Sequence, residues 1–157
     1  MKIAVVFYSL DGNCALVAEE IKALMGADLI RLHTTKDKKR SFIGNLFWGC
    51  GMVFFKKKPK LKPYTFDSAA YDLIILGAPV WADFPAPPLQ TFISETGISG
   101  KKIAFYLCHA GGKGSSAGKF KTLLSGNEII SETDFHDPVK KNIDDVRKQV
   151  ADWVKSF

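Results

Sequence analysis

The stretch that decides the fold is IAVVFYSLDGNCALVAEEIKALMG, residues 3–26. Its first six residues are a continuous apolar run, which is typical of a strand buried on both faces of a parallel sheet. Asp-Gly and Gly-Asn then break the strand within residues 9–13. Apolar side chains follow at helical spacing as far as Gly26, a helix stop signal. The segment therefore predicts a strand, a glycine-containing turn and a helix.

The same order of strand and helix continues along the chain. Apolar runs predict further strands over residues 28–33, 71–77, 102–108 and 128–133. Helices are predicted between Pro87 and Gly97, around Phe120, and from Asp137 as N-cap with Pro138 in the first position. Because alternating buried strands and helices are typical of parallel sheets covered on both faces, and crossovers are right-handed, we predict an α/β fold with a doubly wound sheet.

Charge is concentrated in one segment. The 157 residues carry a net charge of +6, yet residues 36–62 alone hold nine Lys or Arg and one acid, which leaves −2 for the rest. The length fits one domain, so we expect a single domain over residues 1–157, with a basic, aromatic-rich insertion at residues 34–63. A solvated basic face is favoured over a nucleic-acid patch, and we expect no nucleic-acid partner.

The cysteines and apolar stretches bear on location. Cys14, Cys50 and Cys108 are odd in number and contain no CxxC pair, which favours reduced thiols in a cytoplasmic protein. The apolar run at the N-terminus is too short for a secretory signal. The longest apolar-rich stretch, residues 42–55, falls short of the roughly 20 residues that a membrane span needs. We therefore expect a cytoplasmic protein with no transmembrane segment.

The first predicted strand ends in a loop suited to an anion. In doubly wound sheets, ligands bind outside the carboxyl ends of the strands. Residues 9–14 contain Gly12, which lets the backbone approach a ligand, and precede a helix whose N-terminus favours negative charge. Ser9 and Asn13 offer further donors. An ordinary turn with Asp11 or Asn13 capping the helix is an equal alternative.

Two further loops follow the third and fourth predicted strands. Residues 77–85 place Trp81 between prolines, where it either stacks on a flat ligand or folds back onto the core. Residues 108–116 contain three glycines, whose exposed amides suit the edge of a planar heterocycle. A merely flexible loop is the alternative for this third segment.

Other nucleotide and catalytic signatures are absent. No GxGxxG follows a strand, and there is no Walker A sequence. Cys108 and His109 are neighbours, so on a strand their side chains point apart and make a poor nucleophile–base pair. His33 and His136 lie outside metal-ligand spacing, and we expect structural or surface roles for them. The sequence therefore predicts no catalytic side chain and no metal site.

Taken together, these loops resemble the flavodoxin family. Its N-terminal signature fits at Val5, Val6, Phe7, Ser9, Gly12, Ala18 and Ile21, and departs at Cys14, where Thr is expected. Residues 71–92 and 105–114 are similar to the family's second and third flavin loops. The resemblance implies a flavodoxin-like, five-stranded parallel sheet in the order 2-1-3-4-5, and a non-covalently bound FMN.

Carried over by position, the resemblance assigns the FMN contacts. The phosphate would lie at the first loop, the isoalloxazine against Trp81, and the third loop along the ring's other side. The implied cofactor-binding residues are Ser9, Leu10, Asp11, Gly12, Asn13, Cys14, Pro79, Val80, Trp81, Ala82, Cys108, His109, Ala110, Gly111 and Gly112. The flavin would carry the chemistry.

The resemblance implies electron transfer, or reduction of small quinone-like acceptors. The electron partner is a redox protein or a small acceptor, NAD(P)H remains an open donor, and carrier and enzyme are not separated. Asp11 places a carboxylate in the phosphate loop, and a unit charge about 4 Å from a phosphate costs roughly 4 kcal/mol at an effective dielectric near 20. The alternative is therefore a flavodoxin-fold binding module that has lost FMN and uses its basic insertion to engage an acidic partner or a membrane surface.

Overall fold

The fold is described from a computed structural model, which covers residues 1–36 and 58–157. Most of the predicted basic, aromatic insertion, residues 37–57, lies outside the described residues. Its two flanks pair with each other: Thr34 bridges Leu61 in antiparallel fashion, and the Lys62 amide donates to the His33 carbonyl at 2.7 Å. Among the described residues, no helix is long and apolar enough to cross a membrane.

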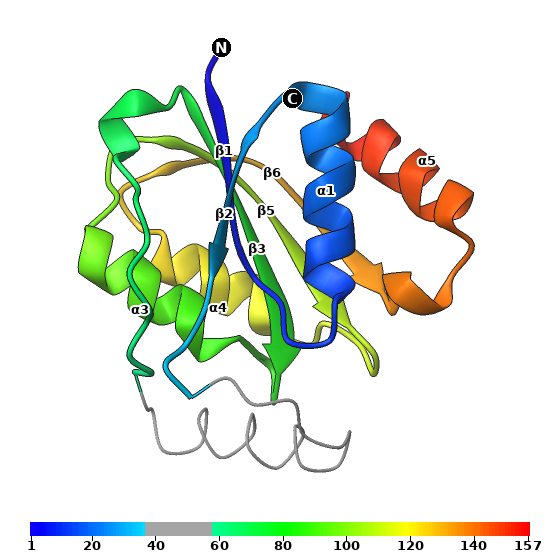
Figure 1. The fold of residues 1–157 in the computed structure, drawn as a ribbon, viewed down its shortest axis with the longest axis horizontal. Helices are drawn as coiled ribbons and strands as arrows, with labels where there is room; N and C mark the ends of the chain where they lie inside the picture. Colours follow the sequence, from blue (N-terminus) through cyan, green and yellow to red (C-terminus); the bar gives the residue numbers. More distant parts are fainter. Residues whose placement is uncertain (37–57) are drawn as a thin grey trace.

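Strands and helices alternate as the sequence predicts (Figure 1). In chain order they are β1 (Ile3–Tyr8), α1 (Asn13–Met25), β2 (Asp28–Leu32), η1 (Ser68–Ala70), β3 (Leu73–Trp81), β4 (Phe84–Pro85), α3 (Pro87–Thr96), β5 (Lys102–His109), α4 (Ser116–Leu123), β6 (Glu128–His136), η2 (Pro138–Lys140) and α5 (Ile143–Val154). Gly26 and Gly97 end α1 and α3, and Pro87 opens α3, which confirms those helix signals.

The sheet has six strands, where the sequence predicted five. Its order is β2-β1-β3-β5-β6, with every neighbouring pair parallel, and β4 pairs with the end of β3. The missed strand, β4, has two residues and runs antiparallel to β3, so that Val80 faces Pro85 and Trp81 faces Phe84. A two-residue strand carries no period for sequence reasoning to detect. The predicted order 2-1-3-4-5 therefore holds for the five parallel strands under shifted numbers.

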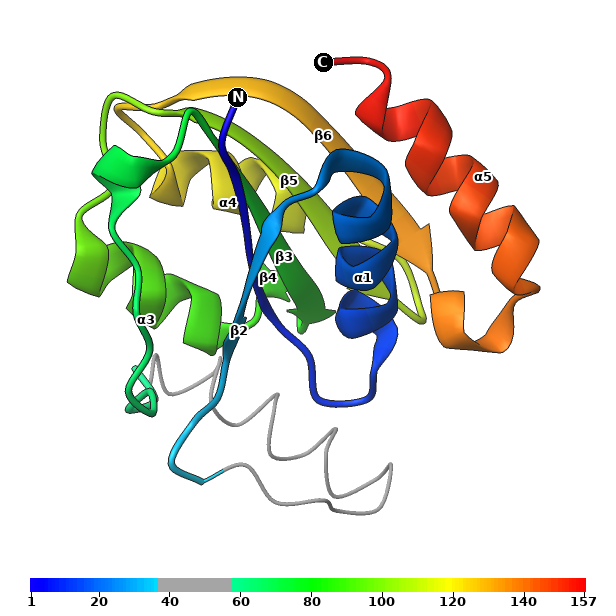
Figure 2. The ribbon, with the colours of Figure 1, turned by 45° about the horizontal axis from the view of Figure 1, so that its top comes forward.

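Helices cover both faces of the sheet (Figures 1 and 2). Helices α1 and α5 pack on one face, and α3 and α4 pack on the other. Alternate residues of each strand serve the two layers: along β1, Val5 and Phe7 join the α1 and α5 side, whereas Val6 and Tyr8 join the α3 and α4 side. Both layers bury apolar side chains, and this is why the strands are continuous apolar runs.

The last helix begins later than the sequence predicted. Asp137 was expected as N-cap, but α5 starts after Asn142, whose Oδ1 accepts the Asp144 amide at 2.9 Å. Pro138 instead opens the short η2 turn. The Asp137 backbone is left-handed (φ 41°), and Lys141 is extended, so the chain cannot run on as one helix.

The strands also run further toward the ligand edge than predicted. β3 continues to Trp81, so residues 79–81 are strand rather than loop, because the β4 hairpin pairs with them. β5 extends through Cys108 to His109, which pairs with His136 at the end of a nine-residue β6. Five of the fifteen candidate ligand residues therefore stand on strand ends, namely Pro79, Val80, Trp81, Cys108 and His109.

Candidate functional site

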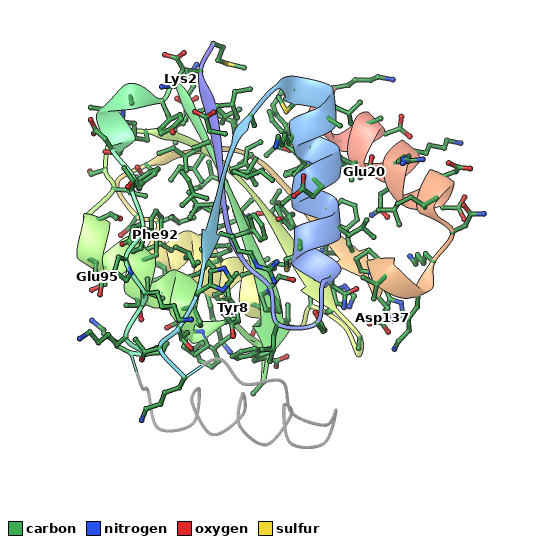
Figure 3. All side chains as sticks on the ribbon, viewed as in Figure 1. Lys2, Tyr8, Glu20, Phe92, Glu95 and Asp137 are labelled. Carbon is green, nitrogen blue, oxygen red and sulfur yellow. The ribbon has the colours of Figure 1, made fainter. Side chains whose placement is uncertain are left out.

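The three predicted ligand segments meet at one edge of the sheet. β1, β3 and β5 are neighbouring parallel strands, so their carboxyl ends lie side by side. Figure 3 places Tyr8 toward this edge and Lys2 at the opposite one. Direct contacts join the segments: the Tyr8 and Trp81 rings are 5.7 Å apart at 90°. The Tyr106 hydroxyl also donates to the Cys14 carbonyl at 2.8 Å.

The first loop is held by its own side chains and by β2. The Ser9 hydroxyl accepts the Ala15 amide at 3.2 Å, and the Ser9 carbonyl accepts from Arg31 Nη2 at 3.0 Å. Gly12 is the N-cap of α1 with φ 95°, a left-handed conformation that favours glycine. The glycine in this loop is therefore required by the turn itself.

Asn13 ties this loop to the turn before α5. Asn13 is buried, with 7% relative exposure, and its Oδ1 accepts the Val139 amide at 3.1 Å. Within the described residues, its Nδ2 has no hydrogen-bond partner. The Oδ1 atom of Asn13 is therefore used in a contact within the fold, whereas its Nδ2 group, at the start of α1, is unpaired among those residues.

Asp11 is exposed, and its carboxylate turns back to the helix. Asp11 Oδ1 accepts the Asn13 amide at 3.2 Å, which satisfies one of the N–H groups that a helix N-terminus leaves open. The amides of Gly12 and Cys14 make no hydrogen bond within the described part of the chain. The loop therefore leaves two backbone amides unpaired in that part of the chain, beside a carboxylate that already uses a third; Gly12 is partly exposed and Cys14 is buried.

The Cys14 side chain is wholly buried. Burial, together with the neighbouring Cys108 thiol and the charge of Asp11, raises the pKa of Cys14 well above its ordinary value, so the thiol stays protonated. Cys108 is also buried and joins the same apolar layer. Neither thiol is therefore exposed at this edge of the sheet.

The second segment is a tight hairpin that carries Trp81. Ala82 (φ 47°) and Asp83 (φ 62°) are both left-handed, as the two central residues of a type I′ turn are. Trp81 is half-buried: it leans on the apolar layer that contains Tyr8 while part of the indole stays accessible. The structure therefore shows the packing of Trp81 on the core, and its stacking on a flat ligand stays a prediction.

The third segment is fastened by His109 and His136 together with Lys113 and Asp134, and sequence reasoning did not single out the last two. His109 Nε2 lies 2.9 Å from Asp134 Oδ2, and Lys113 Nζ lies 2.6 Å from Asp134 Oδ1. His136 donates from Nε2 to the Ala110 carbonyl at 2.7 Å. Burial alone would raise the pKa of Asp134, but hydrogen bonds from His109 and Lys113 and the Lys113 charge outweigh it and lower that pKa. No local motif marks this network, because the pairing of β5 with β6 creates it.

The second and third segments also touch. Gly114 has φ 49°, and a Cβ there would collide with the Asp83 carboxylate. Lys119 of α4 donates to the Asp83 carbonyl at 2.9 Å and lies 3.6 Å from the centre of the Phe84 ring. The hairpin turn after Trp81 is therefore held against the third loop.

The comparisons with known proteins bear on the fold. No family model and no curated protein matches the chain. A flavoprotein from Lactobacillus acidophilus NCFM, crystallised in complex with FMN, is 20% identical, with a TM-score of 0.76 and 98% of each chain covered. A candidate flavoprotein from Bacteroides uniformis ATCC 8492 is 16% identical, with a TM-score of 0.80, covering 96% of this chain and 97% of that one.

A third similar structure is that of two-electron reduced flavodoxin from Megasphaera elsdenii. It is 17% identical, has a TM-score of 0.58, and covers 96% of this chain and 98% of its own. At these identities the likeness concerns the fold. The chain has a flavodoxin-like fold, and the resemblance drawn from the sequence is confirmed at that level.

Proposed function

We propose that this protein binds FMN at the carboxyl ends of β1, β3 and β5 and transfers electrons through it. The observation that carries the proposal is the meeting of three segments at one sheet edge: a helix N-terminus with open amides, an accessible indole and a glycine-rich loop. The FMN complex of the similar L. acidophilus flavoprotein adds support.

The first loop suits the phosphate end of FMN. The amides of Gly12 and Cys14, the Nδ2 group of Asn13 and the positive end of the α1 dipole all favour an anion. The Ser9 hydroxyl accepts the Ala15 amide and keeps its own proton for a ligand. Asp11 opposes phosphate binding, because its carboxylate carries the same sign of charge. That carboxylate would have to turn away from the Asn13 amide when a phosphate binds.

The second and third segments suit the isoalloxazine. Pro79, Val80 and Trp81 at the end of β3 would lie along one side of the ring system, with Trp81 as the aromatic contact. Along the other side run Ala110, Gly111 and Gly112. A Cβ on either glycine would meet nothing within 4 Å, so the backbone there is open to a ligand.

Bound FMN would supply one-electron and two-electron transfer. The chain's residues would bind the flavin, keep water from one face of the ring through Trp81, and set its potential by apolar packing and backbone contacts. The acceptor would be a redox protein or a small quinone-like molecule, and the donor a redox protein or NAD(P)H. We assign no side chain a catalytic role.

The alternative function is docking of an acidic partner or a membrane through the basic insertion. Most of the insertion, residues 37–57, lies outside the described residues, so this alternative stays a prediction; of its lysines, Lys58, Lys60 and Lys62 are described and exposed.

The test is fluorescence quenching of FMN titrated with the purified apoprotein, with riboflavin measured alongside. We expect micromolar or tighter binding of FMN and at least about tenfold weaker binding of riboflavin, because riboflavin lacks the phosphate. Bound FMN should then be bleached by dithionite and restored by air. Failure of both flavins to bind would refute the proposal, and equal binding of both would refute the phosphate loop.

A further inference from the structure

His109 makes two hydrogen bonds, one in which its ring accepts through Nδ1 and one that pairs Nε2 with a carboxylate. The Gly112 amide donates to Nδ1 at 3.1 Å, and Nε2 lies 2.9 Å from Asp134 Oδ2. The His109 side chain is 9% exposed, whereas the Asp134 side chain is 31% exposed and Gly112 is exposed. Both contacts reach from the end of β5, one to the third loop and one to β6.

These two bonds fix the protonation state of the ring. A backbone N–H can only donate, so Nδ1 must carry a lone pair, and the ring proton must be on Nε2, where it is donated to the carboxylate. A doubly protonated ring would point a second N–H at the Gly112 amide. The arrangement is therefore compatible only with the neutral ring in its Nε2–H form.

The groups that surround the ring come from three elements. Asp134 on β6 faces Nε2 and is shared with Lys113 of the loop at 2.6 Å. His136 on β6 has its ring centre 5.5 Å away and is bonded to the Ala110 carbonyl. Asp137, before η2, donates its amide to the His109 carbonyl at 2.9 Å, and its carboxylate pairs with Lys140.

The Gly112 bond is placed to control the whole loop. Gly112 (φ 123°) lies between the Ala110 carbonyl, which His136 holds, and Gly114, which packs on Asp83 in the turn after Trp81. Release of the Gly112 amide would free the stretch of backbone between these two fixed points. That stretch contains Gly111 and Gly112, which the proposed FMN site places beside the isoalloxazine.

We propose that His109 is a positioning residue for the third loop: its neutral ring holds the Gly111–Gly112 backbone in the ligand-binding arrangement, and protonation of the ring releases it. The statement about the loop stands without any ligand. The statement about the ligand rests on the proposed FMN site.

The loop is tested first, in the flavin-free protein, by following the backbone amide of Gly112 by ¹⁵N NMR between about pH 5 and 8, where histidine charge changes are observed. We expect its shift to titrate with one proton and its exchange protection to fall on the acid side. His109→Asn keeps an acceptor near the Nδ1 position but cannot be protonated, so its Gly112 amide should stay protected and should not titrate.

Two outcomes would overturn the positioning role. One is a Gly112 amide that does not respond to pH in the unmodified protein. The other is a response that persists in His109→Asn and disappears in His136→Asn, the matched control, because the second histidine would then be the source. His109→Gln, which reaches toward Asp134 but offers nothing near Nδ1, should leave Gly112 unprotected at every pH.

The ligand is tested by measuring FMN dissociation constants at about pH 5.5 and 7.5 for the unmodified protein and for His109→Asn. Ionisation of the FMN phosphate is common to both proteins and cancels in the comparison. We expect the unmodified protein to lose at least about tenfold more affinity than the variant at the lower pH. Equal losses would overturn the ligand part, whereas no FMN binding at any pH would overturn the proposed function and leave the Gly112 result standing.

Discussion

Gly77 lies at the centre of the sheet, where a single methyl group should have a large effect. It sits on β3, paired with Phe7 of β1 and Tyr106 of β5. A Cβ added there would lie well inside 3.0 Å of the Tyr106 ring and hydroxyl, a separation that real Cβ atoms essentially never show. Tyr106 is fully buried and cannot swing into solvent. Gly77→Ala must therefore displace the Tyr106 ring.

The expected loss of stability has two parts. Overpacking a core position costs about 1–3 kcal/mol. Displacing the ring also breaks the hydrogen bond from the Tyr106 hydroxyl to the Cys14 carbonyl, and a buried hydroxyl left without its partner costs about 1–3 kcal/mol. We therefore expect Gly77→Ala to lower the free energy of unfolding by about 3 kcal/mol, which corresponds to a fall in Tm of about 6–12 °C for a chain of this length.

The assay is urea denaturation followed by circular dichroism, with the slope of the transition checked for two-state behaviour. Gly118→Ala on α4 is the matched control: its Cβ would meet nothing within 4 Å, so the change should be neutral or stabilising. The double variant Gly77→Ala/Tyr106→Leu removes the clashing ring. Its loss of stability should therefore be about 1 kcal/mol smaller than the sum of the losses in the two single variants. A loss below about 0.5 kcal/mol in Gly77→Ala, or strict additivity, would refute the reasoning.

Three further predictions concern the candidate site. Asp11→Asn should tighten FMN binding about tenfold and leave riboflavin binding unchanged in parallel quenching titrations, because it removes the charge beside the phosphate loop. An equal gain in Asp144→Asn, at an exposed position of α5, would show that the effect comes from net charge alone. Trp81→Leu should weaken FMN and riboflavin alike, by about fivefold, through lost aromatic contact with the shared ring; a loss confined to FMN would contradict this placement of the indole. Asp134→Asn should lower stability by about 1 kcal/mol at neutral pH. The pKa of Asp134 is lowered in the folded protein, so its contribution to stability is present above the ordinary Asp pKa of about 3.9 and is lost as pH falls below it. The denaturation curves of the two proteins should therefore converge in acid. A difference that persists in acid would contradict the assignment.

Local signals predicted the main elements of the fold. Continuous apolar runs marked β1 and β5 because both faces of these strands are covered by helices. Gly26 and Gly97 marked helix ends because both adopt the left-handed conformation there. These features are readable from the sequence because each depends on a residue's own conformational preference or on a repeating burial pattern.

Features that depend on strand pairing or on an unusual backbone conformation were not predicted. The strand character of residues 79–81 comes from the β4 hairpin, and the late start of α5 follows the left-handed Asp137. His109 was predicted as a ligand contact, but its bond to Asp134 arises only from the pairing of β5 with β6, which brings residues 25 positions apart together. Sequence periodicity carries no information on that register.

The central claim is that FMN binds at the carboxyl edge of the sheet, and its most direct test is to map FMN-induced shifts of backbone amides by ¹⁵N NMR. The account predicts that the largest shifts fall within residues 9–14, 79–82 and 109–114. The amides of Gly100 and Gly126, which lie at the amino ends of β5 and β6, should not move. Shifts centred on those two glycines, or none at residues 9–14, would contradict the account.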